Sequence, residues 1–293
     1  MPGTTIETFT MDVATLSRAL SALGVAIGTT SWHSPFDDQS PQAQFLDWHN
    51  RNESHVLMLS QLEAMASARA SDLNAFLQGH GFKPMFRDFT QGGVGAAAIL
   101  DMVVNWAVPA QLTNIVSYSA SNYRPARFTG FEVPLEGAAI YEVGGDKLVK
   151  LLTKEGDALW LLKSDVPVSH PFDMVAQAEN AMAGSVGADT TWISSVIVPC
   201  VEIKTTTTLD WMFGLTAGDH YIDQAFQMVK IGMDEKGAYA KVATGLGTTR
   251  GISPRKPVPL VFDRPFYGWF TQANNSIPTA CFFAGEDSWR QAR

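Results

Sequence analysis

Cysteine and metal-binding patterns are scarce in this chain of 293 residues. Its two cysteines, Cys200 and Cys281, stand inside apolar stretches, which is more typical of buried thiols than of a disulfide or a metal site. None of the six histidines falls in a His-Glu-x-x-His or other paired metal-ligand spacing. No Gly-x-Ser-x-Gly elbow occurs, and the glycines around Val94 lack a following Gly-Lys-Ser/Thr. We therefore expect no metal, no cofactor and no enzymatic activity.

Positive charge is also in deficit, with 21 Lys and Arg against 29 Asp and Glu and a net charge of −8. A nucleic-acid partner requires a basic footprint, so we expect none. The longest apolar stretch, residues 94–100, is too short to span a bilayer. Residues 1–7 lack the positive and then apolar pattern of a secretory signal. The sequence therefore predicts no membrane partner and favours a cytoplasmic location.

Apolar residues make up 46% of the chain, with eight tryptophans and seventeen phenylalanines, enough to bury a substantial core. No linker-like tract and no internal repeat interrupts it. We expect a single domain over residues 1–293, mainly helical over 1–110 and rich in strands over 114–293.

The spacing of apolar residues predicts helices over residues 11–27, 56–77 and 95–106. From residue 114 the apolar period shifts towards two, which predicts strands with one helix among them, over residues 172–182. The expected strands cover residues 115–118, 131–135, 139–143, 148–152, 158–162 and 191–198. Helices first and strands later indicate an α+β fold.

A long stretch of small residues separates two apparent strands near the end of the chain. The first strand, residues 228–231, is followed by an acidic pair and Gly237, after which side chains alternate. One face of this extended segment carries Ala238, Ala240, Val242 and Thr244. Loops longer than ~12–15 residues inside a compact domain are usually functional or disordered. An ordinary hairpin with an Ala-rich strand gives the same alternation, so the pattern alone leaves both interpretations open.

Four motifs in the same order resemble the serpin family over residues 157–287. Residues 234–244 (Asp-Glu-Lys-Gly-Ala-Tyr-Ala-Lys-Val-Ala-Thr) resemble the hinge of the family's reactive loop. Residues 260–267 resemble the strand that follows this loop, with its Asn/Asp-basic-Pro-Phe core. A strand with an internal proline over residues 196–203, leading into a short helix within 209–215, and a closing hairpin over 270–287 are similar to the family as well.

The first half of the chain matches the family more weakly, through residues 86–89 (Phe-Arg-Asp-Phe) and 105–107 (Asn-Trp-Ala). The resemblance implies an α+β serpin-like fold, with helices mainly in the N-terminal third, mixed and antiparallel sheets in the remainder, and a long exposed reactive loop at about residues 236–259. The implied hinge residues are Glu235, Gly237, Ala238, Ala240, Val242 and Thr244. Small side chains suit them, because a bulky or charged inward side chain would be buried without a partner, which costs several kcal/mol.

Arg250 stands where the family places the residue that the target protease recognises, between Thr249 and Gly251. A trypsin-like serine protease accepts a long cation in its specificity pocket, so the implied partner is a serine protease of that kind. Counting from Gly237 at the family's usual spacing gives Gly251 instead, one position further on. A solvated loop charge is the other interpretation of Arg250.

The resemblance implies a serine protease inhibitor that acts as a suicide substrate. The protease attacks the loop and forms an acyl-enzyme, and the freed segment inserts into a sheet as an extra strand. Three departures keep open a non-inhibitory serpin-like binding or structural protein whose loop does not insert. The region 215–228 and the N-terminal part are shorter than in the family, and Cys200 replaces a lysine that often pairs with the hinge glutamate, here Glu235. An unrecognised hydrolase is a third possibility, supported only by scattered histidines and serines.

Overall fold

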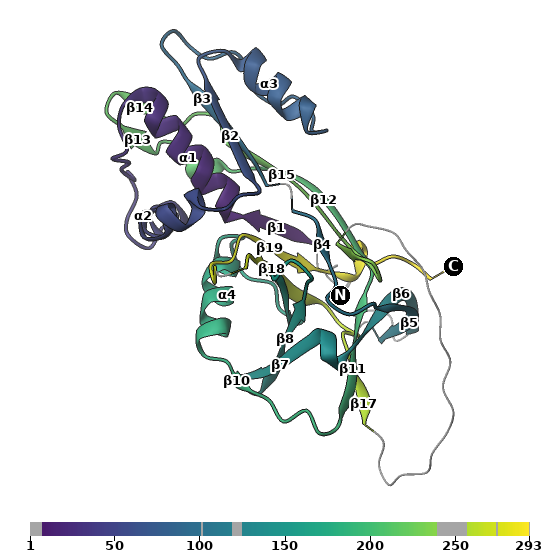
Figure 1. The fold of residues 1–293 in the computed structure, drawn as a ribbon. Coiled ribbons are helices and arrows are strands. Elements are labelled where there is room, and N and C mark those ends of the chain that lie inside the picture. Colours follow the sequence, from purple (N-terminus) through teal and green to yellow (C-terminus); the bar gives the residue numbers. More distant parts are fainter. Residues whose placement is uncertain (1–7, 101, 119–124, 239–256, 274, 293) are drawn as a thin grey trace, which may run out of the picture.

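The computed structural model describes residues 8–100, 102–118, 125–238, 257–273 and 275–292. Its largest sheet has seven strands, each antiparallel to its neighbours, in the order β1-β19-β18-β9-β8-β7-β10 (Figure 1). These strands are β1 (Phe9–Asp12), β7 (Ala138–Val143), β8 (Asp146–Leu152), β9 (Ala158–Lys163), β10 (Val186–Gly187), β18 (Phe266–Thr271) and β19 (Ala280–Ala284).

A second sheet has four strands in the order β17-β11-β6-β5, with β17 parallel to β11 and the other pairs antiparallel. Its strands are β5 (Gln111–Tyr118), β6 (Pro125–Pro134), β11 (Ile193–Pro199) and β17 (Val258–Val261). The apolar core between the two sheets includes Leu159 and Leu161 of β9, whereas Trp160 points to the opposite face and stacks on Trp269. Because both faces of β9 are buried, its sequence reads as an unbroken apolar run.

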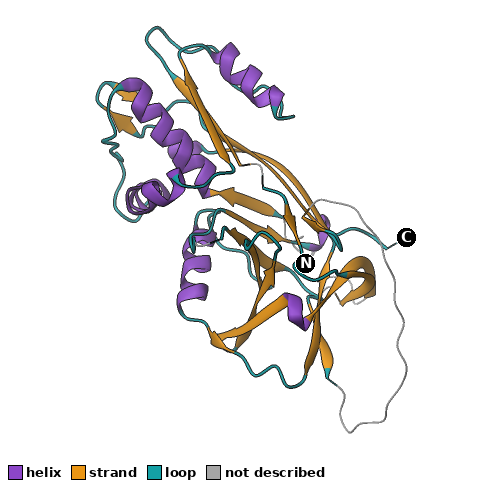
Figure 2. Ribbon diagram, in the orientation of Figure 1, coloured by secondary structure: helices purple, strands orange, loops and turns teal. Residues whose placement is uncertain are grey.

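Helices α1 (Val13–Ile27), α2 (Pro41–Leu57) and α4 (Asp173–Ala183) share the second core, on that other face of the large sheet (Figure 2). Helix α1 begins at Asp12, whose carboxylate accepts a hydrogen bond from the Thr15 backbone N–H, and ends at Gly28 in the left-handed conformation. Helix α2 begins with Ser40 as its N-cap and Pro41 in its first turn. Local capping residues therefore set where α1 and α2 start.

Two further antiparallel pairs extend away from this body, β2 with β3 and β12 with β15 (Figure 1). Their bounds, with those of the small elements around them, are β2 (Leu62–Ser67), α3 (Ala70–Gly79), β3 (Gly95–Leu100), β4 (Val104–Asn105), β12 (Val201–Thr208), β13 (Thr216–Ala217), β14 (His220–Tyr221), β15 (Phe226–Met233) and β16 (Gly237–Ala238). Three short 3-10 helices cover Leu135–Gly137, Asp210–Met212 and Glu286–Ser288.

Two of the helices predicted from the sequence are wrong. Within residues 56–77 the structure places strand β2 before α3, and residues 95–106 form β3 and β4. Alanine is a strong helix former, but β3 pairs with β2 along its whole length and buries every second residue, so tertiary pairing overrides propensity. The first position of this strand requires glycine, because a Cβ at Gly95 would lie 2.3 Å from the Phe89 ring.

The α+β fold class is confirmed, as are the predicted helices at α1 and α4 and all six predicted strands from residue 114 onward. The segment with an internal proline divides at Pro199, so that β11 and β12 lie in different sheets. No helix in the described part of the chain is long and apolar enough to cross a membrane.

Candidate functional site

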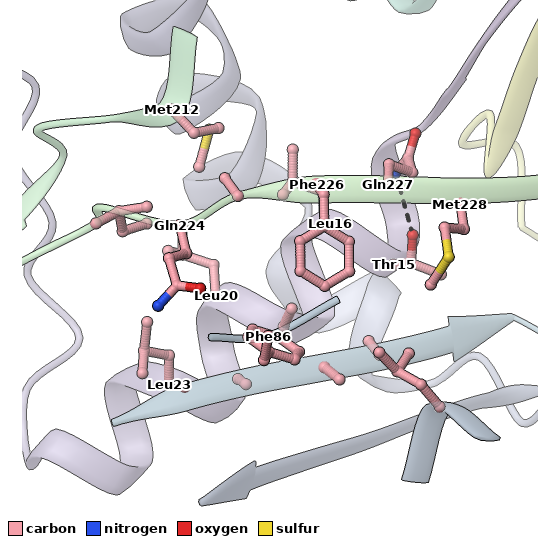
Figure 3. A pocket seen from close by; sticks show the side chains of 18 of the residues that line it. Thr15, Leu16, Leu20, Leu23, Phe86, Met212, Gln224, Phe226, Gln227 and Met228 are labelled. Atoms are coloured by element: carbon pink, nitrogen blue, oxygen red, sulfur yellow. Dashed lines mark hydrogen bonds between the residues drawn. The ribbon is translucent and has the colours of Figure 1, made fainter. Parts of the chain in front are cut away.

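The most unusual feature of the fold is a gap between β3 and β15. Strand β3 pairs with β2 and β15 pairs with β12, and no ladder joins β3 to β15 within the described residues. Their facing edges therefore present backbone N–H and C=O groups without a strand partner, which is the condition under which an added strand is bound. Figure 3 shows the two strands on either side of this opening.

The head of the gap is closed by the short strand β16. After β15 the chain turns, with the Asp234 N–H donating to the Gly237 carbonyl at 3.0 Å and the Gly237 N–H donating back at 3.2 Å. The chain then pairs antiparallel with β4, with Gly237 opposite Asn105 and Ala238 opposite Val104. Strand β16 thus lies between the end of β15 and the continuation of β3.

Only glycine fits at position 237. Its φ of 135° lies where residues with a side chain are strained, and a Cβ would stand 2.3 Å from the Val104 carbonyl oxygen. The turn is also anchored by Trp106, whose indole N–H donates to the Asp234 carbonyl at 2.8 Å. Gly237 therefore acts as the point where the chain reverses into the gap.

Cys200 cannot form the ion pair with Glu235 that a lysine at its position makes in the family, but two other cations lie at this turn. Its carboxylate lies 3.3 Å from the Lys236 ammonium, and the Arg290 guanidinium lies 3.9 Å from the Asp234 carboxylate. Arg290 is held by its backbone N–H, which donates to the Cys200 carbonyl. Cys200 and Cys281 are buried free thiols, as predicted, and burial raises the pKa of Cys200 to about 12. Arg290 thus brings positive charge close to Cys200, although its ion-pair partner is Asp234 rather than the hinge glutamate.

Below the gap, side chains of α1 form the floor of a cavity of about 490 Å³. Leu16, Leu20 and Leu23 project from successive turns of the helix towards Phe226 on β15 (Figure 3). On β3, Ala97 and Ile99 pack with α3, so the alternate residues face α1. The gap therefore opens onto an apolar floor.

A glutamine joins this floor to β15. The Gln227 side-chain amide accepts from the Asp12 N–H at 2.8 Å and donates to the Asp12 carbonyl at 2.7 Å. The Asp12 carboxyl is buried beside it, and burial raises its pKa to about 7 although hydrogen bonds from Thr15 and Ala14 act to lower it. This arrangement holds the start of α1 against β15 independently of β3.

Residues 81–89, here named the strap, cross the outer side of the gap from α3. Phe86 of the strap packs on Phe226 of β15 with ring centroids 4.8 Å apart. The Gln224 amide accepts from the Arg87 N–H at 3.0 Å and donates to its carbonyl at 3.2 Å. The Lys230 ammonium donates to the Gly81 carbonyl at 2.6 Å and lies 4.4 Å from the centroid of the Phe82 ring. The strap therefore ties the β2–β3 pair to β15 where no backbone ladder does.

Three of the predicted hinge residues, Glu235, Gly237 and Ala238, come together at the head of the gap. The other predicted site residues lie outside the described part of the chain, namely Ala240, Val242, Thr244, Thr249, Arg250 and Gly251. Sequence reasoning missed the strap and the Gln227 contact. Four phenylalanines among residues 76–89 were a signal for the strap, but an apolar residue in a loop does not indicate which strand it will cover.

The region 215–228 is short because β13 and β14 form a tight hairpin, with Thr216 opposite Tyr221 and Ala217 opposite His220. Its N-terminal strand also bridges to His33 before α2. In the described residues, no group of three or more His, Cys, Asp or Glu is arranged to hold a metal ion.

No known family model and no curated protein matches the sequence. Solved structures do match the fold. The native thermophilic serpin tengpin has 12% identity and a TM-score of 0.60, with 96% of this chain and 89% of that chain covered. The mouse protein-Z dependent protease inhibitor has 10% identity and a TM-score of 0.58, with 94% and 90% covered. Human thyroxine-binding globulin, solved with its hormone, has 10% identity and a TM-score of 0.59, with 94% and 91% covered.

These neighbours define the class: the chain is an α+β protein with the serpin fold. At 10 to 12% identity it is a divergent version of that fold, which a protease inhibitor and thyroxine-binding globulin share.

Replacing Gly237 with alanine should weaken the turn at the head of the gap. The added Cβ strains the backbone and meets the Val104 carbonyl, so we expect a loss of about 1–3 kcal/mol in the free energy of unfolding. Denaturant unfolding measures this loss. The control is Gly187→Ala, at a strand glycine whose added Cβ has nothing within 4 Å. Equal stability of both variants would contradict the role of Gly237.

Phe86→Ala should loosen the strap. Removal of the half-buried Phe86 ring leaves Phe226 without its partner. We expect the free energy of unfolding to fall by about 1–2 kcal/mol and hydrogen exchange to become faster at the strap amides bonded to Asn74. Met85→Ala removes a neighbouring exposed side chain and should leave both quantities near the wild-type values. Unchanged exchange in Phe86→Ala would show that the strap is held without this contact.

Asp12 should make stability depend on pH. The folded-state pKa of about 7 lies above the usual value of 3.8, so the protonated carboxyl stabilises the fold fully below about pH 4 and this contribution is lost as the pH rises through 7. Asp12→Asn keeps an N-cap acceptor and cannot ionise. We expect the melting temperature of the wild type to fall relative to Asp12→Asn between pH 5 and 8. Asp38→Asn, at an exposed position, is the control, and parallel pH profiles for wild type and Asp12→Asn would refute the assignment.

Proposed function

We propose that this protein inhibits a serine protease as a suicide substrate, through insertion of its reactive loop into the gap between β3 and β15. One observation carries the proposal: β16 already enters the head of the gap as a strand, antiparallel to β4, above two edges that lack ladder partners. A chain that continues beyond Ala238 in the same direction would complete both ladders.

The pairing of β16 fixes the register of such an insertion. In an antiparallel ladder each step forward on one strand is a step back on its partner. Continued from Ala238 opposite Val104, the register places Val242 opposite Leu100 and Thr244 opposite Ala98. Both partners on β3 face α1.

The pairing with β15 predicts the same inward orientation independently. The bridge of Gly237 with Asp234, continued, places Ala240 opposite Ile231 and Val242 opposite Val229. Ile231 and Val229 are buried on the inner face of β15. Since paired residues in a ladder point to the same side, the small residues of the proposed hinge would face inward in an insertion that continued either pairing.

Arg250 is the residue that a trypsin-like protease would recognise in this mechanism, with Thr249 and Gly251 beside it. The protease serine attacks the carbonyl carbon of the recognised residue, its proton passes to the leaving amine through the protease histidine, and an ester joins the two proteins. Insertion of the freed strand then carries the protease away before water completes hydrolysis. The fall in free energy on insertion comes from backbone pairing along β3 and β15.

A non-inhibitory serpin-like binding or structural protein is the second candidate. The strap favours it, because its contacts with Gln224, Phe226 and Lys230 lie across the gap that an incoming strand must enter. If these contacts persist during protease attack, the loop cannot insert and is either cleaved as an ordinary protease substrate or not cleaved at all.

The test is incubation with trypsin-like serine proteases followed by denaturing electrophoresis. We expect a covalent complex with the wild type, none with Arg250→Ala, and cleavage without a complex for Thr244→Glu, which would place a charge on the inward face. Lys241→Glu, on the face expected to point outward, is the matched control and should form the complex. Cleavage of the wild type without complex formation, and with an unchanged melting temperature afterwards, would favour the second candidate.

A further inference from the structure

We propose that the cavity above α1 binds a neutral, mainly apolar small molecule, and that an occupied cavity and an inserted strand exclude each other. The binding itself stands apart from the inhibitory function proposed above. The mutual exclusion rests on that function.

The cavity has the size and walls of a small-molecule site. Its volume of about 490 Å³ falls within the roughly 300–1,000 Å³ of typical ligand pockets. Leu16 and Leu23 lie on the inner side of α1 yet remain partly exposed, because no protein atom fills the space in front of them. Phe86 of the strap and Phe226 of β15 project into the opening from the other side (Figure 3). The site is thus walled by rigid elements on three sides and covered by aromatic rings.

Two polar side chains beside the apolar part of the cavity are engaged within the protein. Gln227 bonds to Asp12, and Gln224 bonds to the strap backbone. The buried side-chain polar atoms without a partner in the described residues belong to Asp157, Gln177 and Trp289, and none of these lines the cavity. No buried, unpartnered side chain in this part of the chain is therefore available to replace the hydration of an ion.

The charge around the opening narrows the ligand class further. Asp219 and Asp223 are exposed residues of the lining, at the end formed by the β13–β14 hairpin. Lys230 also belongs to the lining, but its ammonium is engaged by the Gly81 carbonyl and lies over the Phe82 ring. The two exposed carboxylates therefore disfavour an anionic amphiphile such as a fatty acid. The unpaired edges of β3 and β15 offer backbone donors and acceptors to a hydroxyl or amide group. The expected ligand is a neutral ring compound, or a similar hydrophobic molecule, that carries one or two hydroxyl or amide groups.

Ligand and strand would occupy the same space. In the insertion proposed above, Val242 and Thr244 would face inward between β3 and β15, above the α1 side chains that line the cavity. A molecule seated on Leu16 and Leu20 blocks those positions. A ligand would therefore hold the protein in the state with an open gap.

The binding test is a fluorescence titration of the full chain with Nile red, a neutral dye whose emission shifts in apolar surroundings. We expect one saturable site in the wild type. Leu23→Trp, which fills the cavity from α1, should lower the affinity at least tenfold. Val25→Trp, at a position on the same helix that is 77% exposed, should leave it unchanged. Ala98→Ile fills the cavity from β3 instead and should also lower the affinity, which guards against a folding defect in one variant.

Absence of saturable binding to the wild type, or equal affinity in Leu23→Trp, Ala98→Ile and Val25→Trp, would overturn the site. The exclusion is tested with protein nicked in the loop. If nicking raises the melting temperature and Nile red binding is lost, the exclusion is supported; if the melting temperature rises and binding persists, the exclusion is wrong. A melting temperature that does not rise counts against the inhibitory function, and the titration of the intact protein still decides the binding.

Discussion

Two strand edges that face each other without a ladder are the constraint around which this structure is arranged. Among the residues that the structure describes, β3 pairs with β2 alone and β15 with β12 alone, and their other edges border the same gap. Backbone groups in a protein need hydrogen-bond partners, and open edges invite an added strand. The elements that surround the gap hold it open and limit what enters it.

Those elements act at different levels. At the head, Gly237 lets the chain reverse tightly enough for β16 to pair with β4. At the floor, Gln227 fastens β15 to the start of α1. On the outer side, the strap joins β15 to the β2–β3 pair through side chains rather than through a ladder. Side-chain contacts can be released one at a time, whereas a continuous ladder opens cooperatively, so this construction keeps two packed halves together without sealing the space between them.

The fold was predictable from the sequence where the signal was local or carried by a motif. Period-two runs located the strands from residue 114 onward, the spacing of apolar residues located α1, and the four serpin-like motifs indicated the family fold that the structural neighbours share. The alanine run of β3 was misassigned because helix propensity is a property of the residue, while its pairing with β2 joins residues 28 to 38 positions apart. The strap was not predicted for a related reason, since a phenylalanine in a loop gives no signal for the strand it covers.

The sequence by itself determined the pattern from which the hinge was predicted: an acidic pair, a glycine and small alternating residues stand in that order whatever surrounds them. Only the tertiary structure decided that Gly237 meets Val104, that Arg290 brings its charge to the turn, and that a 490 Å³ apolar cavity lies under the gap. Alternation is a property of neighbouring residues and survives in any context. A gap is the absence of a contact between distant strands, and it exists only once both have found their other partners.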